Sequence, residues 1–480
     1  MIASGVPGLD EVLGGGLRAG HIYFVEGAPG TGKTTLALQF ALEGVRRGEA
    51  TLVISMAECA DELCTSAASH GWDLSGLALR DLAAPDAVRS TALFELSEVE
   101  LDERVDAVLA EMDALRPARL VLDTLGALRD FCTQPWQFRR RLEQFRDKAQ
   151  ALGTTMLFTD DLTGGEQLRP RSLAWGLIQL EQRIGDYGPP RRRLWLPKLR
   201  GQPYSGGCHD MRIATGGVQV FPRLETPAPT EPAAGGQVQS GVAELDTLLG
   251  GGLERGTSLG ILGPPGCGKS TLVCLFALAA VARGERAALY LFDEAEETLK
   301  LRSKSQQLDI EAALASGLLE LRQIDPAELA PGELAQELRT EVLERGTRII
   351  AIDSLNGYLQ AMPDERFMSL HVHHLLSWLG RHRVLTLVTL ALPSPLSQKA
   401  GLDLDLSYIT DAVIAQRYFE AYGSMRYAMS VIKKRYGDHE RTIREFRIGP
   451  KGIIVGEPLS EFRGVLSGVP EYVGARQPLL

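Results

Sequence analysis

The chain has 480 residues, of which 44% are hydrophobic and 23% are charged, and its formal net charge is −10 at pH 7. This length exceeds one ordinary domain, because single hydrophobic cores stop growing near roughly 250–300 residues. The composition excludes a disordered chain, and the acidic balance argues against a protein whose whole surface follows a nucleic-acid backbone.

The cysteines and the apolar stretches indicate the compartment. The six cysteines have no spacing typical of a zinc site or a disulfide framework, which favours a reducing environment. Residues Met1 to Asp10 have no basic start and do not resemble a signal peptide. The strongest apolar stretch, Val384 to Leu392, is too short to cross a bilayer. We therefore expect a cytoplasmic protein with no membrane role.

The chain repeats itself. The segment GVPGLDEVLGGGL, which starts at Gly5, recurs as GVAELDTLLGGGL from Gly241. The same offset carries GAPGTGKTT, starting at Gly27, onto GPPGCGKST, starting at Gly263. Two separated blocks that stay in register indicate a duplication, and therefore two related domains.

The repeat also predicts where the domains end. Between the copies lies LETPAPTEPAAGG, whose Pro, Ala, Thr and Gly content favours an extended linker. We predict a first domain over 1–223, a linker over 224–237, a second domain over 238–462 and a short tail over 463–480.

Short β-branched runs alternate with helical stretches in each copy. The runs HIYFVEG, TLVIS, LVLD and TTMLFT are separated by stretches such as Lys33–Arg46 and Gln137–Leu152. This alternation predicts an α/β fold, with a mainly parallel sheet that is covered by helices on both faces. Trp175–Gln182 and Arg191–Leu199, separated by GDYGPP, predict a β-hairpin appended at the sheet edge.

Each domain contains a complete phosphate-binding loop between a predicted strand and a predicted helix. Glycines let backbone N–H groups surround a phosphate, the lysine adds charge, and the next hydroxyl binds Mg²⁺. The ATP-binding residues expected in the first loop are Gly27, Gly30, Thr31, Gly32, Lys33, Thr34 and Thr35. Those in the second are Gly263, Gly266, Cys267, Gly268, Lys269, Ser270 and Thr271. ATP and Mg²⁺ are therefore the expected cofactors, with Thr34 and Ser270 as metal ligands.

Asp123 and Asp353 each end an apolar strand, where a carboxylate emerges beside the phosphate-binding loop. Such an aspartate is often a helix cap, but the neighbouring loops favour a role in ordering the Mg²⁺ shell. A general base must also orient water toward the γ-phosphate. The repeat aligns Ala57 and Glu58 with Asp293 and Glu294, so Glu58 and Glu294 are the candidate bases. Solvated loop glutamates remain the alternative.

These motifs together resemble the KaiC family, the RecA-like ATPases and autokinases of circadian clocks. The resemblance spans nearly the whole chain and includes a K-x-R repeat at the end of each domain. It implies two tandem RecA-like P-loop NTPase domains, each a mainly parallel sheet flanked by helices with an appended β-hairpin. It also implies a homohexameric double ring that holds ATP between neighbouring subunits.

In the family, the K-x-R residues reach the γ-phosphate that the next subunit holds. The matching residues, expected to bind ATP, are Lys198, Leu199 and Arg200 in the first domain, and Lys433 and Arg435 in the second. An ordinary basic strand end is the alternative.

The chain departs from the family at the carboxylate pair, where family members have two Glu in both domains. With Ala57 before it, hydrolysis in the first ring is expected to be slow or to rest on Glu58 alone. The first carboxylate of the second pair is the family's base for autophosphorylation. Asp293 keeps that charge on a shorter arm.

The family's phosphoacceptors are adjacent Ser and Thr residues before an I-T-D segment, and this chain has Ser407 and Tyr408 there. The tyrosine hydroxyl lies farther from the backbone, so one geometry cannot serve both acceptors equally. Ser407 is the expected phosphoacceptor and Tyr408 the second candidate. An unmodified interface strand is the alternative.

The leading hypothesis is an ATP-hydrolysing hexamer with serine/threonine autokinase activity in its second domain and a signalling or timing role. Its implied partners are itself and a KaiB-like protein, or a response regulator or histidine kinase. The C-terminal segment EFRGVLSGVPEYVGARQPLL resembles the start of the family's regulatory loop but is shorter than that loop. No KaiA-type activator is therefore expected. The rivals are a RecA-like DNA-dependent ATPase, which the acidic charge disfavours, and a nucleotide-gated scaffold with vestigial hydrolysis.

Overall fold

The computed structural model describes residues 1–82, 97–130, 132, 135–161, 171–184, 188–225, 236–325, 327–360, 368–391, 409–421, 423–466 and 470–474. Within these ranges the chain forms two compact units. Met1–Arg223 makes up almost all of the first, and Leu224–Leu329 with Leu334–Leu480 makes up the second. Most of the predicted linker lies outside the described residues.

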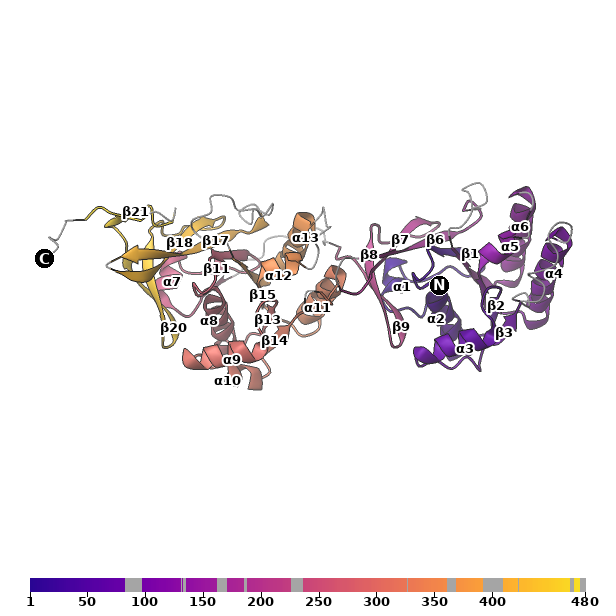
Figure 1. Ribbon diagram of the computed structural model, residues 1–480, viewed down its shortest axis with the longest axis horizontal. Coiled ribbons are helices and arrows are strands. Elements are labelled where there is room, and N and C mark those ends of the chain that lie inside the picture. The colour runs from indigo at the N-terminus through magenta and orange to yellow at the C-terminus, as the bar shows by residue number, and fades with distance from the viewer. Residues whose placement is uncertain are drawn as a thin grey trace. The chain divides into compact units, whose positions relative to one another are not determined.

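The first unit is built on one sheet (Figure 1). Its described strands lie in the order β3-β2-β4-β5-β1-β6-β7-β8-β9. The first six are parallel: β3 (Ala78–Asp81), β2 (Thr51–Ser55), β4 (Arg119–Asp123), β5 (Thr155–Asp160), β1 (Ile22–Gly27) and β6 (Gly176–Arg183). The last three continue antiparallel: β7 (Arg191–Leu199), β8 (His209–Ala214) and β9 (Gly217–Phe221). Its helices are α1 (Leu9–Val12), α2 (Lys33–Arg46), α3 (Ala60–Ser69), α4 (Ser97–Leu115), α5 (Leu125–Asp130) and α6 (Pro135–Leu152).

The second unit repeats this topology. Its described sheet has the order β14-β13-β15-β16-β12-β17-β18-β19-β20. These strands are β14 (Leu319–Gln323), β13 (Ala287–Leu291), β15 (Ile349–Asp353), β16 (Leu385–Ala391), β12 (Ser258–Gly263), β17 (Ala412–Ala421), β18 (Ser424–Lys434), β19 (Arg444–Gly449) and β20 (Gly452–Pro458). Two small ribbons pair β10 (Gln237–Val238) with β11 (Leu253–Glu254), and β21 (Phe462–Arg463) with β22 (Glu471–Tyr472). The helices are α7 (Ala243–Leu248), α8 (Lys269–Ala282), α9 (Glu296–Ser305), α10 (Ile310–Ala315), α11 (Pro331–Leu343), α12 (Leu355–Gln360) and α13 (Met368–Arg381).

Helices cover both faces of each sheet, as the alternation of strands and helices predicted. In β1, Tyr23 and Val25 join the core cluster that includes α2 and α3. Ile22 and Phe24, which alternate with them, join the opposite cluster with α4, α5 and α6. A central parallel strand is apolar on both sides for this reason. The predicted fold class, two tandem RecA-like domains, is therefore confirmed.

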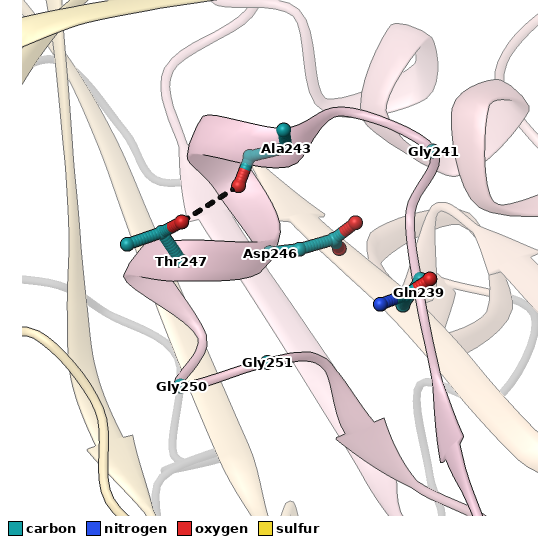
Figure 2. Close-up of a pocket in the computed structure, with 7 residues that line it drawn as sticks. All are labelled: Gln239, Gly241, Ala243, Asp246, Thr247, Gly250 and Gly251. Carbon is teal, nitrogen blue, oxygen red and sulfur yellow. Dashed lines mark hydrogen bonds between the residues drawn. The ribbon is translucent and has the colours of Figure 1, made fainter.

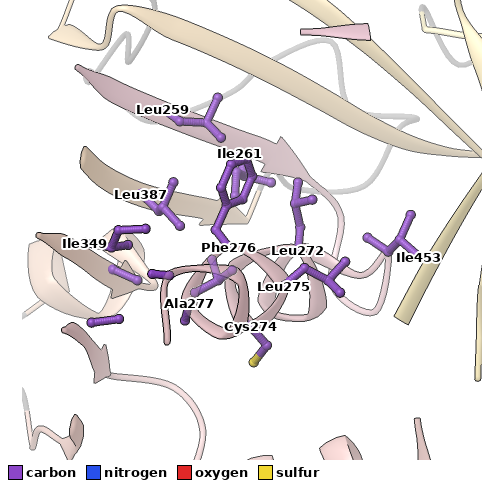
Figure 3. Close-up of a cluster of buried hydrophobic side chains, with 14 of the residues drawn as sticks. Leu259, Ile261, Leu272, Cys274, Leu275, Phe276, Ala277, Ile349, Leu387 and Ile453 are labelled. Atoms are coloured by element: carbon purple, nitrogen blue, oxygen red, sulfur yellow. The ribbon is translucent and has the colours of Figure 1, made fainter. Parts of the chain in front are cut away.

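Helix α8 shows how the phosphate-binding loop is anchored. It is apolar around its whole circumference, which is typical of a helix that is buried on all sides. Figure 3 shows Leu272 and Phe276 of this helix packed beneath Ile261 of β12 and Leu387 of β16. Residues of α10 close the same cluster from another side. The loop between β12 and α8 is thus held at both ends by buried elements.

The sheet extends farther than the sequence predicted. The hairpin of β6 and β7 is present, but β6 also pairs in parallel with β1, so it continues the main sheet. Strands β8 and β9 then extend the antiparallel part, and they were not predicted. Their sequence MRIATGGVQVF contains the expected signal, a Gly-Gly turn between two apolar runs.

The glycine-rich repeat that opens each domain forms a fixed loop. Asp246 Oδ1 accepts a hydrogen bond from the Ser240 amide at 2.7 Å, and Asp10 Oδ1 accepts one from the Ser4 amide at 2.8 Å. Figure 2 shows Asp246 beside a surface hollow, with the Thr247 hydroxyl donating to the Ala243 carbonyl at 2.9 Å. The aspartate of the repeat therefore stabilises this loop.

A side chain from within the K-x-R segment or just after it clamps the glycine run in each domain. Gln202 Nε2 donates to the carbonyls of Leu13 and Gly16 at 2.6 and 2.8 Å. Lys434 Nζ donates to the two corresponding carbonyls of the second domain at 2.8 and 2.9 Å. Different residues thus make the same contact, which joins the first motif of each domain to its last.

Gly14 lies at the tightest point of this clamp. Its φ is +71°, and a Cβ there would lie 2.2 Å from the Pro203 carbonyl oxygen. We expect Gly14→Ala to lower the free energy of unfolding of the first domain by about 1–3 kcal/mol, through strain and the clash. Urea unfolding checks this.

The control is Gly15→Ala, because Gly15 also has a positive φ, +115°, but a Cβ there meets nothing within 4 Å. Equal losses in the two variants would show that the backbone conformation decides the cost and that the contact with Pro203 does not.

Candidate nucleotide sites

Both phosphate-binding loops are shaped to hold an anion. The first loop connects β1 to α2, and the second connects β12 to α8. Lys33 Nζ donates to the carbonyls of Gly27 and Ala28 at 3.0 and 3.1 Å. Lys269 Nζ makes the same two contacts with its own loop, both at 2.9 Å. Each ammonium group therefore lies inside its loop, at a helix N-terminus, where a phosphate binds.

The residue just before the last glycine of each loop, Thr31 or Cys267, is buried and stabilises the turn. Thr31 Oγ1 donates to the Ala28 carbonyl at 2.8 Å. Cys267 Sγ lies 3.5 Å from Gln416 Oε1 of β17, and burial raises the pKa of this thiol. These two side chains act on the shape of the loop rather than on a ligand. Thr271 also points elsewhere, since its hydroxyl donates to Gln306 Oε1 at 3.2 Å.

The predicted metal ligands meet in the first domain. Thr34 Oγ1 donates to Asp123 Oδ2 at 2.7 Å, and the Thr159 hydroxyl donates to Oδ1. Burial raises the pKa of the Asp123 carboxyl, while these hydrogen bonds oppose the rise. In the second domain Thr389 donates to Asp353 in the same way, and Ser270 is the second residue of α8, as Thr34 is of α2.

This donor set suits Mg²⁺. A hydroxyl and a carboxylate are oxygen ligands that Mg²⁺ takes from a protein when nucleotide phosphates and water supply the rest. Within the described ranges no group of three or more His, Cys, Asp or Glu side chains could hold a metal ion alone. A cation at this place would therefore depend on the nucleotide.

Glu58 follows β2 and lies near the end of β4. Burial raises the pKa of its carboxyl, and the nearby charges of Asp123 and Glu62 raise it further. No salt bridge to Glu58 is found in the part of the chain that the structure describes. The candidate base of the first domain is thus half-buried among acidic neighbours, which favours proton uptake.

Glu294 occupies the corresponding place in the second domain but has a cationic partner. Its Oε2 lies 2.9 Å from Nη2 of Arg302 in α9. Burial raises the pKa of Glu294, Arg302 opposes the rise, and Asp353 adds to it. The adjacent Asp293 accepts a hydrogen bond from the Ser354 hydroxyl. The sequence did not indicate either partner.

The lysines of the two loops also differ in their surroundings. Lys33 Nζ forms a salt bridge with Asp161 Oδ1, at the end of β5, at 2.8 Å. Asp161 follows Thr159 by two residues, and the residue that follows Thr389 by two in the second domain is Ala391. A nucleotide entering the first site must therefore displace a carboxylate from the lysine, whereas the second domain has Ala391 at the corresponding position.

The K-x-R residues lie at the opposite ends of the strands from the phosphate-binding loops. Lys198 Nζ donates to the Arg171 carbonyl at 2.7 Å, and Lys433 Nζ donates to the Thr410 carbonyl at 2.8 Å. Their strands end beside the first residues of β6 and β17, whereas the phosphate-binding loops begin at the opposite ends of β1 and β12. At about 3.3 Å per residue, each K-x-R segment is on the order of 10–15 Å from the phosphate-binding loop of its own domain. This distance is too long for its side chains to reach a γ-phosphate bound there.

The remaining predicted site residues divide into three groups. Leu199 packs against the core of the first domain, so its side chain does not face a ligand. Arg200 and Arg435 end the K-x-R segments, and Arg435 Nη1 lies 3.4 Å from Asp411 Oδ1. Ser407 and Tyr408 lie outside the described residues.

The structure also shows a support that the sequence did not indicate. Tyr418 of β17 donates its hydroxyl to the Pro265 carbonyl of the second loop at 2.7 Å. The first domain has Gln182 at this place in β6. The second loop therefore has an extra tether from β17, the strand that pairs with β12.

Comparisons with known proteins agree with the repeat and with the two sites. A family model described as "ATPase: KaiC" matches residues 2–225 and again residues 238–460. The chain is 26% identical over 483 residues to the circadian clock oscillator protein KaiC of Acaryochloris marina, covering 98% of this chain and 91% of the relative. It is 26% identical over 483 residues to the protein of the same name from Synechococcus elongatus, with the same coverage of both chains.

None of the described helices is long and apolar enough to cross a membrane.

The salt bridge of Lys33 leads to a test of nucleotide affinity. We expect Asp161→Ala to tighten ATP binding to the first domain by about threefold to tenfold, because ATP no longer competes with a carboxylate for the lysine. Titration of a fluorescent ATP analogue onto protein that also carries Lys269→Ala, which disables the second loop, measures this site alone.

The reciprocal variant is Ala391→Asp, tested in a Lys33→Ala background. It should weaken binding to the second domain by a similar factor. Unchanged affinity in both variants would show that the salt bridge does not compete with nucleotide.

Proposed function

The chain belongs to the KaiC family of ATPases, and we propose that each of its domains binds ATP with Mg²⁺ and hydrolyses it. The observation that carries this proposal is the duplicated site. In each copy a lysine lies inside the phosphate-binding loop, an aspartate ends the adjacent strand, and a glutamate is placed near that aspartate. This is the set of groups that phosphoryl transfer to water requires.

The residues of each loop divide the work of binding. Backbone N–H groups between Gly27 and Lys33, and between Gly263 and Lys269, would surround the β- and γ-phosphates. Thr34 with Asp123, and Ser270 with Asp353, would hold Mg²⁺, which neutralises phosphate charge when it is bound.

Glu58 and Glu294 are the proposed bases. Each would hold a water in line with the γ-phosphate and accept its proton as the oxygen attacks phosphorus. The raised pKa of Glu58 suits it to this role, because a more basic carboxylate takes a proton more readily. The proximity of each glutamate to its aspartate supports the assignment.

We propose that the chain acts as a homohexamer in which nucleotide lies between subunits. Support comes from the position of Lys198, Arg200, Lys433 and Arg435 at the sheet edge away from their own phosphate-binding loops. A basic group there can contribute to catalysis only if it serves the nucleotide of a neighbouring subunit. The scaffold alternative, with vestigial hydrolysis, draws support from Ala57 and from the pairing of Glu294, and turnover measurements separate it from an ATPase.

The second domain is proposed to transfer phosphate to its own chain, with Asp293 as the base and Ser407, or else Tyr408, as the acceptor. The acidic side chain beside the second site supports this, as does the family to which the chain belongs. The relatives are named as circadian clock oscillator proteins, so we propose a timing or signalling role. A KaiB-like protein, or a response regulator or histidine kinase, is the proposed partner. None of the six cysteines, all of which lie in the described ranges, forms a disulfide, which supports a cytoplasmic location.

Replacement of the proposed bases tests hydrolysis. We expect Glu58→Gln together with Glu294→Gln to lower ATP turnover at least about 100-fold, because general-base catalysis typically contributes that much. ATP binding should persist, since neither residue lies in the phosphate-binding loops. The ATP turnover that remains in each single variant measures hydrolysis at the other site. Glu297→Gln is the control, because Glu297 is close in sequence but its side chain is 88% exposed. Full turnover in the double variant would contradict the assignment.

The raised pKa of Glu58 adds a pH signature. A carboxyl with a raised pKa is protonated at higher pH, so turnover by the first domain should fall on acidification before an ordinary glutamate, of pKa 4.5, would titrate. The folded state also holds this proton more tightly than the unfolded chain, so stability is lost as the pH rises through the folded pKa. Glu58→Gln should therefore raise the melting temperature at pH 7 while lowering activity.

Phosphorylation of the chain tests the kinase proposal separately. After incubation with ATP and Mg²⁺, intact-mass analysis should show an added phosphate that Ser407→Ala removes. Tyr408→Phe is the matched variant and should keep the phosphate. An unmodified wild-type mass would contradict autokinase activity, and a phosphate retained by Ser407→Ala would move the acceptor elsewhere.

A further inference from the structure

The ion pair between Glu294 and Arg302 distinguishes the second site from the first. Arg302 lies on α9, which begins two residues after Glu294, and its Nη2 is 2.9 Å from Glu294 Oε2. The two side chains are 30% and 21% exposed, so the pair is partly withdrawn from solvent. An ion pair in this setting is screened less than one on the surface.

Glu294 is the carboxylate that pairs with Arg302 in the described part of the chain. The guanidinium is also close to the Cys274 thiol, but burial raises the pKa of that thiol to about 12, so it stays neutral. Nε and Nη2 of Arg302 are buried and have no aligned hydrogen-bond partner. The positive charge of Arg302 is therefore balanced mainly by Glu294.

Among the described residues of the first domain no equivalent of this pair is present. Helices α3 and α9 have the same length, and Ser66 occupies in α3 the position that Arg302 occupies in α9. Ser66 uses its carbonyl to accept a hydrogen bond from the Ser69 hydroxyl. The charged groups that act on Glu58 are the carboxylates of Asp123 and Glu62. The two candidate bases thus have the same place in the fold and each lies near an aspartate, but only Glu294 has a described arginine beside it.

We propose that Arg302 is a positioning residue that holds Glu294 in an ion pair and so restrains ATP hydrolysis in the second domain. This inference rests on the proposed function, because it takes Glu294 to be the base for water. A carboxylate that is paired with a guanidinium is a weaker proton acceptor, and it is held toward α9. Hydrolysis then requires the pair to loosen.

The restraint favours transfer to a side chain over transfer to water. In hydrolysis the water oxygen bonds to the γ-phosphorus, the bond from phosphorus to the β–γ bridging oxygen breaks, ADP leaves, and Glu294 takes the proton. In transfer to the chain a side-chain hydroxyl attacks the same phosphorus, the same bond breaks, and Asp293 takes the proton. Asp293 is hydrogen-bonded to Ser354 and not to Arg302, so the ion pair slows the first reaction selectively.

The test uses a Glu58→Gln background, in which turnover reports the second domain. We expect Arg302→Ser, which installs the residue of the first domain, to raise kcat about threefold to tenfold, the size expected from loss of a partly buried ion pair. KM should not change, because Arg302 does not belong to the phosphate-binding loop. Arg302→Lys keeps the positive charge and should restore most of the restraint. Adding Glu294→Gln should abolish the gain.

Two readouts besides turnover accompany the comparison. The ratio of ADP to ATP bound to the quenched protein should rise in Arg302→Ser, and the fraction of chains that carry phosphate, measured by intact mass, should fall. A role of Arg302 in stability alone would instead lower the melting temperature and leave the ratio unchanged.

If Arg302→Ser does not fold, the reciprocal variant in the first domain tests the inference. In a Glu294→Gln background, Ser66→Arg should lower turnover of the first domain by a similar factor, and Ser66→Gln, of comparable length without charge, should not. Unchanged or lower kcat in folded Arg302→Ser, or an unaffected Ser66→Arg, would overturn the inference. Loss of the proposed function itself has a different signature: full turnover in the variant that lacks both Glu58 and Glu294.

Discussion

The hydrogen bond from Thr34 to Asp123 joins the start of α2 to the end of β4, and the rest of the first site depends on it. It fixes the helix N-terminus against the adjacent strand, so that the loop, the aspartate and Glu58 share one edge of the sheet. Burial would otherwise favour protonation of Asp123, and the two hydroxyl donors oppose this. The oxygens of Thr34 and Asp123 that form this hydrogen bond are also the ones that suit Mg²⁺, so metal binding would exchange one set of contacts for another.

Duplication has kept this frame and changed its charges. In the first domain the loop lysine is paired with Asp161, and within the described ranges the proposed base has no cationic partner. In the second, the base is paired with Arg302, and Ala391 leaves the lysine without that carboxylate. The first arrangement favours exchange and turnover, and the second favours retention of nucleotide. The loss of a carboxylate at Ala57 predicted hydrolysis that is slow or rests on Glu58 alone, and the proposed role of Glu58 as a base corresponds to the second of these alternatives.

The fold and the ligand-binding frame could be predicted because they depend on short, contiguous motifs whose spacing fixes their geometry. Helix α2 begins and ends at the predicted residues, and Asp123 ends its strand as expected. The charge partners could not be predicted, because each depends on where a side chain from another segment points. Asp161 and Ala391 lie at matching distances in sequence from Asp123 and Asp353, but the sequence does not show that the Asp161 carboxylate reaches Lys33. Arg302 is one of several charged residues on an exposed helix. Strands β8 and β9 were missed although their turn signal is present.

The hydrogen bonds that clamp the glycine run connect the glycine-rich repeat at the start of each domain with the K-x-R segment near its end. This contact explains why the two motifs occur together. Carbonyls of the glycine loop accept hydrogen bonds from Gln202 in the first domain and from Lys434 in the second, which lie just beyond and within the K-x-R segment. The proposed hexamer assigns those basic strand ends to the nucleotide of a neighbouring subunit, and such a role would depend on a rigid position. The two domains reach the same contact with an amide in one and an ammonium in the other. The contact therefore constrains the backbone of the loop, which only glycine can follow at Gly14 and Gly250, more than it constrains the donor.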